Sequence, residues 1–531
     1  MAAATSKPTS ASPRGPVRRW LRRLAVVLGV LVLAAVGSGT WVYVEAYQSN
    51  VGELNFTNPL KIPPVLAPAV DAQGRKRFQL TLQSGRTELL PGTTTETWGV
   101  NGTYLGPTLR ASRGDQVAID VVNQLPETTT VHWHGMRLPA EMDGGPHQPI
   151  PTGTTWSPYW TVDQPAASLW YHPHLHGRTA EHVYRGVTGM FLLDDEESAR
   201  LTLPNDYGVD DIPLVVQDKQ LNDDGSLDLS TSGPLGAQET YGLLGDRILV
   251  NGTYDPYLQV SSTRVRLRVL NAANARSLHV GFTDGRPFHL IGTDSGLLAA
   301  AQRLDRVRLS PGERAEIVAE FRPGEQVVLR SFAPGEGGGF PQDRLAGADD
   351  EFDLVKIVAD DQLTGSPPVP PRLATTPAEI TAPAGATVRT FRLSGTSKIN
   401  ENQMDLSRID EVVPAGAHEV WEVTNPGSPH SFHIHEVSFQ ILDIDGEPPP
   451  PYARGRKDTV YLPPGSTARL AVQFGPHTDP DSPYMYHCHM LEHEDDGMMG
   501  QFVIVEPGTE DQVPRHLPGA GPHQHRADGN T

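Results

Sequence analysis

Residues 487–498 read His487-Cys488-His489-Met490-Leu491-Glu492-His493-Glu494-Asp495-Asp496-Gly497-Met498, and they contain the only cysteine of the 531-residue chain. In an extended strand, successive side chains point to opposite faces. His487 and His489 would then lie on one face and Cys488 on the other. We therefore expect a strand over Tyr484–Met490 that serves two metal sites.

The first of these sites has the ligand types of a blue copper centre. Cys488 would provide a thiolate, His493 an imidazole and Met498 a weak axial thioether. A trigonal set of two histidines and one cysteine, with a distant methionine, is typical of copper that transfers electrons. One more histidine must come from elsewhere in the chain. His487 and His489 would face the second metal site.

Further His-x-His pairs lie in two other parts of the chain. One part contains His132-Trp133-His134 and His172-Pro173-His174, and the other contains His430 followed by His433-Ile434-His435. Each pair presents two imidazoles on one face of a strand. With His487 and His489, four pairs would converge as eight nitrogen ligands at the interface of two related domains. Eight imidazoles suit three copper ions with positions left open for dioxygen.

An internal repeat predicts three related domains. From Phe78 onward, short β-branched runs are broken by Gly, Pro, Asn and Asp, which is typical of β-sandwiches. Val100-Asn101-Gly102-Thr103-Tyr104 recurs as Val250-Asn251-Gly252-Thr253-Tyr254, and more weakly as Ile399-Asn400-Glu401-Asn402. The period of about 150 residues is one sandwich per unit. Each copy is followed by an alternating strand that ends at asparagine: Val117–Asn123, Val265–Asn271 and Glu419–Asn425.

The N-terminal segment predicts export of the chain. Arg18-Arg19-Trp20-Leu21-Arg22-Arg23 precedes the uncharged apolar run Leu24–Val44, which as a helix would span roughly 31 Å, close to the ~30 Å of a bilayer core. Arginines before the run place the N-terminus in the cytoplasm and the body outside. The alternative is a cleaved signal peptide, of the general or the twin-arginine type. The body would then be periplasmic or extracellular, and otherwise it would be held at the outer face of the cell membrane.

Composition excludes several classes of function. The formal charge of −20 disfavours binding to nucleic acid or to anionic membrane surfaces. The 52 glycines and 48 prolines favour many turns and short strands. A single cysteine excludes an internal disulfide framework, and a metal would protect the lone thiol of an exported protein.

With these motifs the chain resembles the three-domain multicopper oxidases, the laccase-like family of cupredoxin proteins, from about Phe78 to Val505. Asp210–Lys219 and Asn274–Leu278 resemble the bacterial copper-efflux oxidase branch in particular. The resemblance implies an all-β fold with three cupredoxin-like Greek-key β-sandwich domains, preceded by an N-terminal apolar membrane or signal segment. The expected segments are a basic cytoplasmic N-terminus (1–23), the anchor or signal segment (24–44), a tether (45–72), cupredoxin domain 1 (73–200), cupredoxin domain 2 without copper ligands (201–364), a linker (365–385), cupredoxin domain 3 with type 1 copper (386–507) and a disordered tail (508–531).

The resemblance also implies four copper ions, one of type 1, one of type 2 and two of type 3. Type 1 copper would take His430, Cys488, His493 and Met498. Type 2 copper would take His132 and His433. The type 3 pair would take His134, His172 and His489 on one ion, and His174, His435 and His487 on the other. Every ligand position of the family pattern is present in the sequence.

The implied reaction is oxidation of a small donor by dioxygen. A phenolic or aromatic-amine donor would give one electron at a time to type 1 copper. Cys488 would pass it through the flanking histidines, and four such events would reduce O2 to two waters. Asp143 and Glu494 match acidic positions that the efflux branch uses for proton supply, although a turn-forming Asp and a solvated Glu are the structural alternative. We expect a monomer without a nucleic-acid partner, bound to membrane through its N-terminal segment if that segment is not cleaved.

The sequence leaves alternatives for the donor and the function. Copper-efflux relatives carry a Met-rich insertion near the third domain, whereas this chain has no methionine between Met190 and Met404, and Thr424–Pro429 lacks Met and Asp. This favours a laccase-like oxidase over a metal-ion (cuprous) oxidase of copper tolerance. A copper-free cupredoxin scaffold, like the bacterial cell-division relatives with this fold, would require lost ligands. A nitrite reductase would be built from two such domains per chain.

Overall fold

The computed structural model describes residues 3–4, 16–230, 240–335, 337–374 and 380–517. Residues 375–379 of the expected linker and 518–531 of the expected tail lie outside the described residues. The chain divides into two compact units, Met1–Tyr47 and Gln48–Thr531.

The N-terminal unit contains one long helix, α1 (Pro16–Glu45). Its stretch Arg23–Glu45 has a mean hydropathy of 2.1 and is long and apolar enough to cross a membrane. A signal sequence has the same length and composition. The expected N-terminal apolar segment is therefore present as a helix.

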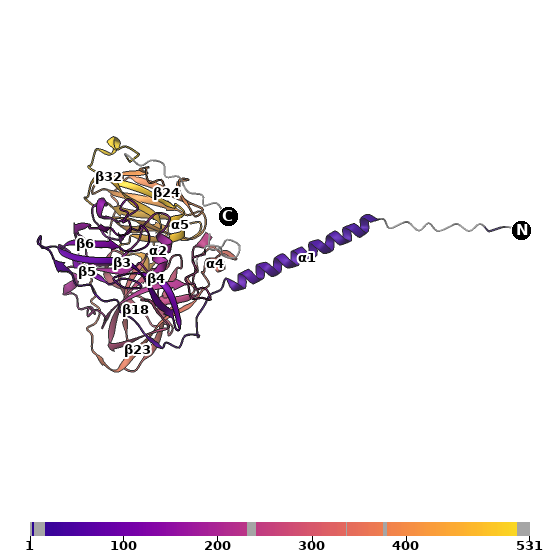
Figure 1. The fold of residues 1–531 in the computed structure, drawn as a ribbon, viewed down its shortest axis with the longest axis horizontal. Helices are drawn as coiled ribbons and strands as arrows, with labels where there is room; N and C mark the ends of the chain where they lie inside the picture. The colour runs from indigo at the N-terminus through magenta and orange to yellow at the C-terminus, as the bar shows by residue number, and fades with distance from the viewer. Residues whose placement is uncertain (1–2, 5–15, 231–239, 336, 375–379, 518–531) are drawn as a thin grey trace. The chain divides into compact units, whose positions relative to one another are not determined.

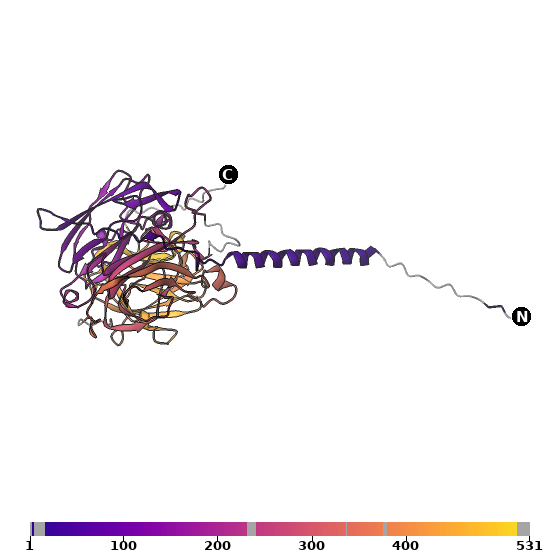
Figure 2. The ribbon, with the colours of Figure 1, turned by 90° about the horizontal axis from the view of Figure 1, so that it is seen from below.

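The second unit is built from strands, and its described residues form six sheets, two for each of three sandwiches (Figures 1 and 2). This confirms the all-β fold class. In the first sandwich, Phe78, Trp133 and Phe191 belong to one buried core between the two sheets. Its strands are β2 (Ala69–Val70), β3 (Lys76–Leu90), β4 (Thr93–Val100), β6 (Gln116–Asn123), β8 (Thr155–Trp156) and β9 (Tyr159–Thr161) in one sheet, and β5 (Leu109–Ser112), β11 (Gly189–Asp194), β10 (Ala167–His172) and β7 (His132–His134) in the other.

The second sandwich has a seven-stranded and a six-stranded sheet and a mainly aliphatic core, with Leu267, Ile317 and Val355 fully buried. Residues 45–72, the expected tether, contribute β1 to it, and β1 pairs in parallel with β15. Its strands are β14 (Thr253–Tyr254), β13 (Arg247–Val250), β12 (Asp211–Lys219), β16 (Arg264–Asn271), β21 (Arg314–Glu320), β18 (Phe288–Thr293) and β19 (Gly296–Leu304) in one sheet, and β1 (Asn58–Pro59), β15 (Pro256–Ser262), β23 (Phe352–Thr364), β22 (Gln326–Ser331), β17 (Leu278–Phe282) and β20 (Arg306–Leu309) in the other.

The third sandwich packs Phe391, Trp421 and Phe502 between two five-stranded sheets. It lies beside the first sandwich (Figures 1 and 2), and histidines of the two approach one another closely. Its strands are β25 (Lys398–Ile399), β24 (Val388–Ser394), β27 (His418–Thr424), β31 (Thr467–Gln473) and β29 (Ser438–Ile444) in one sheet, and β26 (Glu411–Pro414), β33 (Met499–Val505), β32 (Asp479–Cys488), β28 (His430–Ile434) and β30 (Thr459–Leu462) in the other.

The repeated asparagines make the same contacts in all three sandwiches. Asn101 has a positive φ of 55°, its side-chain oxygen accepts from the N–H of Thr81 at 2.7 Å, and its own N–H donates to the Thr81 carbonyl at 2.8 Å. Asparagine tolerates this left-handed backbone because its short side chain bonds locally. Asn251 and Asn400 repeat this geometry with Val215 and Arg392.

A second asparagine in each sandwich braces the loop that follows its strand. The side-chain oxygen of Asn123 accepts from the N–H of Leu125, two residues later, and its amide donates to the carbonyls of Glu127 and Ile150. Asn271 and Asn425 make the corresponding three bonds. The internal repeat read from the sequence is therefore a structural repeat.

The first and third sandwiches also contact each other through two short helices. α2 (Thr179–Arg185) packs against α5 (Leu491–Asp495) through an apolar cluster that includes Val183 and Leu491. The Asp495 carboxylate accepts the backbone N–H groups of the first turn of α2 at 2.8 Å. The other short helical elements are η1 (Ala140–Met142), η2 (Ser198–Arg200), α4 (Gln342–Leu345), η4 (Pro451–Ala453) and η5 (Glu510–Gln512).

Candidate metal centre

Strand pairing brings the His-x-His pairs together in register. In the first sandwich, β10 runs antiparallel to β7 and His172 lies opposite His132. In the third sandwich, β32 runs antiparallel to β28 and His487 lies opposite His433. Because side chains two residues apart share a face, each register match places four imidazoles on one surface.

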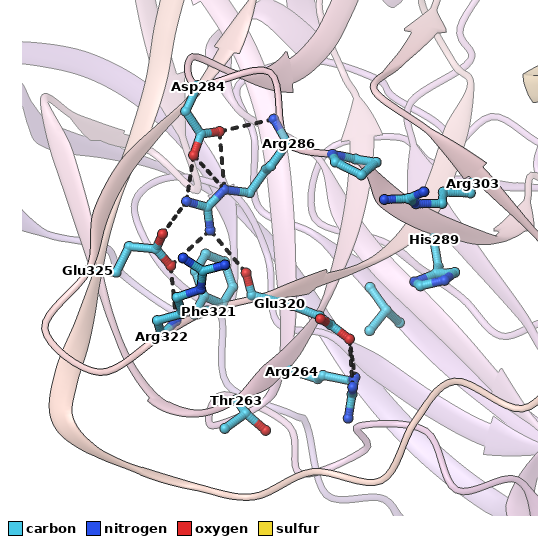
Figure 3. A pocket seen from close by; sticks show the side chains of 12 residues that line it. Thr263, Arg264, Asp284, Arg286, His289, Arg303, Glu320, Phe321, Arg322 and Glu325 are labelled. Carbon is cyan, nitrogen blue, oxygen red and sulfur yellow. Dashed lines mark hydrogen bonds and ion pairs between the residues drawn. The ribbon is translucent and has the colours of Figure 1, made fainter.

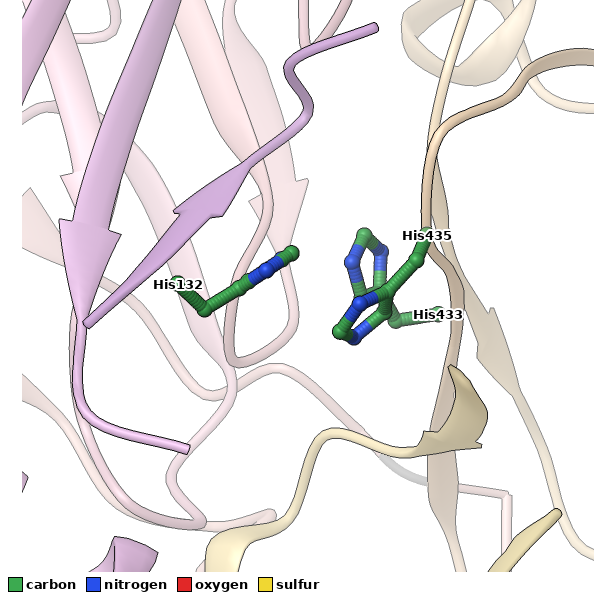
Figure 4. Close-up of side chains that lie close together, drawn as sticks. All are labelled: His132, His433 and His435. Carbon is green, nitrogen blue, oxygen red and sulfur yellow. The ribbon is translucent and has the colours of Figure 1, made fainter. Parts of the chain in front are cut away.

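The two surfaces meet, and the eight histidines form one buried cluster. The Nε2 atom of His174 lies 3.1 Å from the Nε2 atoms of both His435 and His487. The ring of His132 stacks on that of His435 with centroids 3.8 Å apart. Figure 4 shows His132 approaching from β7 while His433 and His435 approach from the opposite side. All eight rings are at most 1% exposed, namely His132, His134, His172, His174, His433, His435, His487 and His489.

The cluster fits metal ions better than it fits a hydrogen-bonded core. The Nε2 atoms of His132 and His433, and both ring nitrogens of His489, are buried without a hydrogen-bond partner among the described residues. Buried polar atoms in folded proteins are normally paired, so these nitrogens require a partner of another kind. Three groups of histidines have one nitrogen each within 4.8 Å of the others: His132, His433 and His435; His132, His134 and His172; and His174, His435 and His487.

Burial keeps six of these imidazoles in the form that binds metal. It lowers the pKa of His489 to about 3, with a smaller effect from the neighbouring His487 ring. Neutral imidazole offers a free lone pair, whereas the protonated ring has none. The same cause holds the pKa well below the ordinary histidine value at five further rings: His134, His172, His174, His433 and His435.

Cys488 lies on the other side of its strand in a second candidate site. Its Sγ is 3.4 Å from Nδ1 of His430 and 3.6 Å from Nδ1 of His493. The Nε2–H of His493 donates to the Thr240 carbonyl at 3.0 Å, which leaves Nδ1 free toward the sulfur. Met498, the expected axial ligand, is fully buried, and its carbonyl accepts the N–H of Cys488.

The thiol of Cys488 would lose its proton only when a metal binds. Burial raises its pKa to about 12, so without a metal it holds its proton at neutral pH. A bound soft metal replaces that proton, and metal binding at the sulfur is then coupled to proton release.

The strand around the cysteine begins earlier than expected, at Asp479, and ends earlier. β32 ends at Cys488 and not at Met490, because the chain bends toward α5. His489 still faces the histidine cluster, because its ring centroid lies 4.9 Å from that of His134 and 5.3 Å from that of His172. The opposite orientations expected for Cys488 and its flanking histidines are observed.

Both expected acidic residues contact the histidine cluster. Oδ2 of Asp143 accepts from Nδ1 of His435 at 2.7 Å, and its carbonyl lies 3.0 Å from Nδ1 of His132. The carboxylate of Glu494 lies 3.1 Å from Nδ1 of His487 and 3.4 Å from Nδ1 of His174. Burial alone would raise the pKa of Glu494, but the adjacent His174 and His487 hold it below its usual range.

A third carboxylate, which the sequence analysis missed, also lies against the cluster. Asp458 is fully buried, and its Oδ1 lies 3.1 Å from Nε2 of His134. Arg314 of the second sandwich donates to both carboxylate oxygens of Asp458, at 2.7 and 2.6 Å. No sequence pattern marks this contact, because Asp458 is 324 residues from His134 and 144 from Arg314.

One pocket adjoins the candidate site of Cys488, and another lies apart from both candidate sites. One lies beside His430 and is lined by residues that include Tyr241, Tyr461 and Met490. The other, of about 490 Å³, lies on the second sandwich and is lined largely by charged side chains such as Arg286 and Glu325 (Figure 3). The latter contains none of the expected site residues.

Comparison with known proteins identifies the family. Models described as multicopper oxidase match residues 81–198 and 372–508. The chain is 35% identical over 461 residues to multicopper oxidase mco of Staphylococcus haemolyticus, covering 84% of this chain and 93% of the relative. It is 36% identical over 453 residues to cell division protein FtsP of Escherichia coli, covering 84% and 92%. A solved structure of the bacterial laccase-like multi-copper oxidase CueO from Ochrobactrum sp. aligns with a TM-score of 0.75 and 36% identity, covering 84% of this chain and 100% of that one.

This similarity along most of the chain agrees with the histidine cluster and the single buried cysteine. The protein belongs to the multicopper oxidase family.

Proposed function

We propose that this protein is a laccase-like oxidase that couples four one-electron oxidations of a phenolic or aromatic-amine donor to the reduction of O2 to water. The observation that carries the proposal is the pair of adjoining sites on one strand. Cys488 faces His430 and His493, while its neighbour His487 faces His174 and His435. Two adjacent residues thus join a donor-side site to an oxygen-side site.

One compact histidine group, His174, His435 and His487, coincides with an expected type 3 set, whereas the other two groups share His132 and do not follow the expected division. Type 1 copper would be held by His430, Cys488, His493 and Met498, and three further ions by the eight clustered histidines. Bound copper would supply one-electron transfer and binding positions for dioxygen. Several ligand side chains are held by hydrogen bonds at their other ring nitrogen, as in the contact between Nε2 of His493 and the Thr240 carbonyl, so the chain holds these rings in place for a metal.

The surface around the pocket beside His430 supports an aromatic donor. The cavity itself, of about 10 Å³, holds at most one water molecule, so a donor would contact its mouth. The pocket contains two tyrosine rings, Tyr241 and Tyr461, and one thioether, Met490. Its lining includes no carboxylate among the described residues. Aromatic walls suit a flat phenol, whereas a cuprous ion calls for several soft ligands. This agrees with the absence of a methionine-rich segment in the chain.

The carboxylates at the cluster support proton delivery by Asp143 and Glu494. Reduction of O2 to water consumes protons at a buried site, so groups that can pass protons on must lie within reach of it. Asp143 contacts His435 and Glu494 lies beside His487, and both histidines belong to the trio His174, His435 and His487.

Similarity to FtsP favours a second candidate, a copper-free scaffold in cell division. A scaffold has no use for unpaired buried imidazole nitrogens such as those of His132 and His433. We therefore rank the oxidase first. Purified protein reconstituted with copper should be intensely blue, show the near-ultraviolet absorption of a type 3 pair and consume O2 with 2,6-dimethoxyphenol. Colourless protein that retains no copper would support the scaffold instead.

The donor preference has its own test. We expect kcat/KM for 2,6-dimethoxyphenol to be at least as high as that for Cu(I) under the same conditions. A clear preference for Cu(I) would replace the laccase assignment with cuprous oxidation. Oxidase activity without turnover of a phenol would also contradict the laccase assignment.

We further propose that the body works outside the cytoplasm. The apolar stretch Arg23–Glu45 supports an anchor or an export signal. Fractionation of cells should find the activity outside the cytosol. Sequencing of the mature N-terminus separates the two alternatives, because a start near Gly39 excludes an anchor.

A further inference from the structure

The second sandwich supplies none of the expected copper ligands, yet one of its turns touches the histidine cluster. The turn Ser310–Arg314 connects β20 to β21, and Gly312 has a positive φ of 87°. A Cβ atom on Gly312 would lie 3.0 to 3.1 Å from three ring atoms of His489. The bare backbone of Gly312 therefore packs against the His489 ring.

The same turn also holds Ser431, the residue whose carbonyl bonds to the His489 backbone. Oγ of Ser310 lies 2.8 Å from Oγ of Ser431, which also donates to the Pro311 carbonyl at 2.9 Å. The carbonyl of Ser431 accepts the N–H of His489. The turn thus contacts His489 at its ring and, through Ser431, at its backbone.

Arg314 acts on a second imidazole of the cluster, His134, through Asp458. All five guanidinium N–H groups have acceptors: two oxygens of Asp458 and the carbonyls of Ser168, Asp294 and Gly312. This complete set of bonds fixes the position of the guanidinium group. The bidentate pair with Asp458 is both strong and directional.

Asp458 in turn accepts hydrogen bonds from two adjacent imidazoles, from Nε2 of one ring and from Nδ1 of the other. Its carboxylate accepts from Nε2 of His134 at 3.1 Å, which leaves Nδ1 of His134 as the free lone pair. Its backbone carbonyl accepts from Nδ1 of His433 at 2.8 Å, which leaves Nε2 of His433 free. The free Nδ1 of His134 lies 3.4 Å from Nε2 of His172, its expected partner on one type 3 ion.

We propose that the turn Ser310–Arg314 of the second sandwich is a positioning element for the trinuclear centre, acting through Arg314 and Asp458 on His134 and through Gly312 on His489. These two imidazoles are expected to bind the same type 3 ion. The inference rests on the proposed function, because it assigns those histidines to copper. It gives the ligand-free sandwich a direct part in forming the oxygen-side site.

The first test replaces Arg314 with methionine. Arg314→Met leaves the Asp458 carboxylate buried without its cation, so His134 loses its fixed orientation. The affinity for the copper ions of the trinuclear centre should fall by about 10- to 100-fold, measured by metal analysis and by the type 2 EPR signal, while the blue absorption per folded molecule stays. The matched control is Arg276→Met, because Arg276 is equally buried in the same sandwich and pairs with Asp218 and Asp350 but with no histidine.

The second test uses glycines and does not depend on a buried charge. Gly312→Ala should weaken trinuclear copper binding through contact with His489. Gly285→Ala has a similar backbone cost at a φ of 72° but meets nothing within 4 Å, and should bind copper normally. In the metal-free proteins, the imidazole NMR signals of His489 should shift for Gly312→Ala only.

The outcomes separate this inference from the proposed function. Wild-type protein that binds no copper contradicts the proposed function itself. Wild-type protein with a full set of ions, together with Arg314→Met and Gly312→Ala variants that have wild-type copper content and EPR spectra, overturns the positioning role alone. Equal copper loss in the control variants also overturns it, because the effect would then reflect general destabilisation.

Discussion

The Nδ1 atom of His435 donates to the Oδ2 atom of Asp143 at 2.7 Å, and the two residues belong to different sandwiches. Since Nδ1 carries the proton, Nε2 of His435 is the free nitrogen, and it points to Nε2 of His174 and His487 at 3.1 and 3.2 Å. Asp143 therefore sets which nitrogen of His435 faces the other two rings of its trio.

Asp143→Asn should slow turnover by about 100-fold, the lower end of the range for loss of a proton-transfer group. An amide still fits the site but does not exchange protons as a carboxyl does. Stopped-flow reduction of type 1 copper by the donor should keep its wild-type rate, because that step needs no proton at the cluster. The exposed Asp163, which pairs with Arg113, provides the control Asp163→Asn. Slowing of both half-reactions would refute a specific proton role.

Glu494→Gln should also slow the reaction with oxygen and leave donor oxidation fast. Under oxygen the variant should accumulate in a reduced or peroxide-level state, seen by rapid-scan absorption. Glu492→Gln is the matched control, because Glu492 lies on the same helix, is also buried and bonds to Asn274 instead of a cluster histidine. Accumulation of the same species in both variants would assign the effect to α5 as a whole.

Cys488→Ser should abolish the blue absorption and oxidase turnover. A hydroxyl cannot replace a thiolate as a soft ligand, whereas the eight histidines of the cluster remain. Metal analysis and the type 2 EPR signal should show copper in the cluster of the variant. Blue colour that persists in this variant would be incompatible with the type 1 assignment.

Lys219 predicts a pH dependence of stability. Its ammonium is buried, has no hydrogen-bond partner among the described residues and lies 4.0 Å from the centre of the Tyr184 ring. Burial lowers its pKa to about 7, below about 10.4 for an unfolded lysine. Between these values the unfolded chain holds more protons, so this lysine makes the unfolding free energy rise with pH, by about 1.4 kcal/mol per unit.

Lys219→Met removes that slope. The variant should be more stable than the wild type at pH 7, and the difference in Tm should shrink at pH 9. The exposed Lys61 provides the control Lys61→Met, whose Tm difference from the wild type should not change over this range. A constant difference for Lys219→Met would show that the buried lysine does not titrate between these pH values.

The strand periodicity made much of the site predictable. Two-residue alternation places His487 opposite in direction to Cys488 wherever a strand forms, and this holds although β32 ends at Cys488. The contact of Arg314 with Asp458 was not predictable in this way. It depends on how the second sandwich packs on the third, and local patterns carry no information about contacts between residues 144 positions apart.

The asparagine braces have a consequence for the origin of the chain. Asn271 makes the same three side-chain bonds as Asn123 and Asn425, although its sandwich contributes no paired histidines. The brace is thus inherited with the fold and independent of metal. Three copies of one ancestral gene segment, of which the middle one gave up or never acquired imidazoles, account for this pattern. Under the positioning role proposed for the turn Ser310–Arg314, the middle copy would have been retained as the neighbour that holds the ligands of the other two.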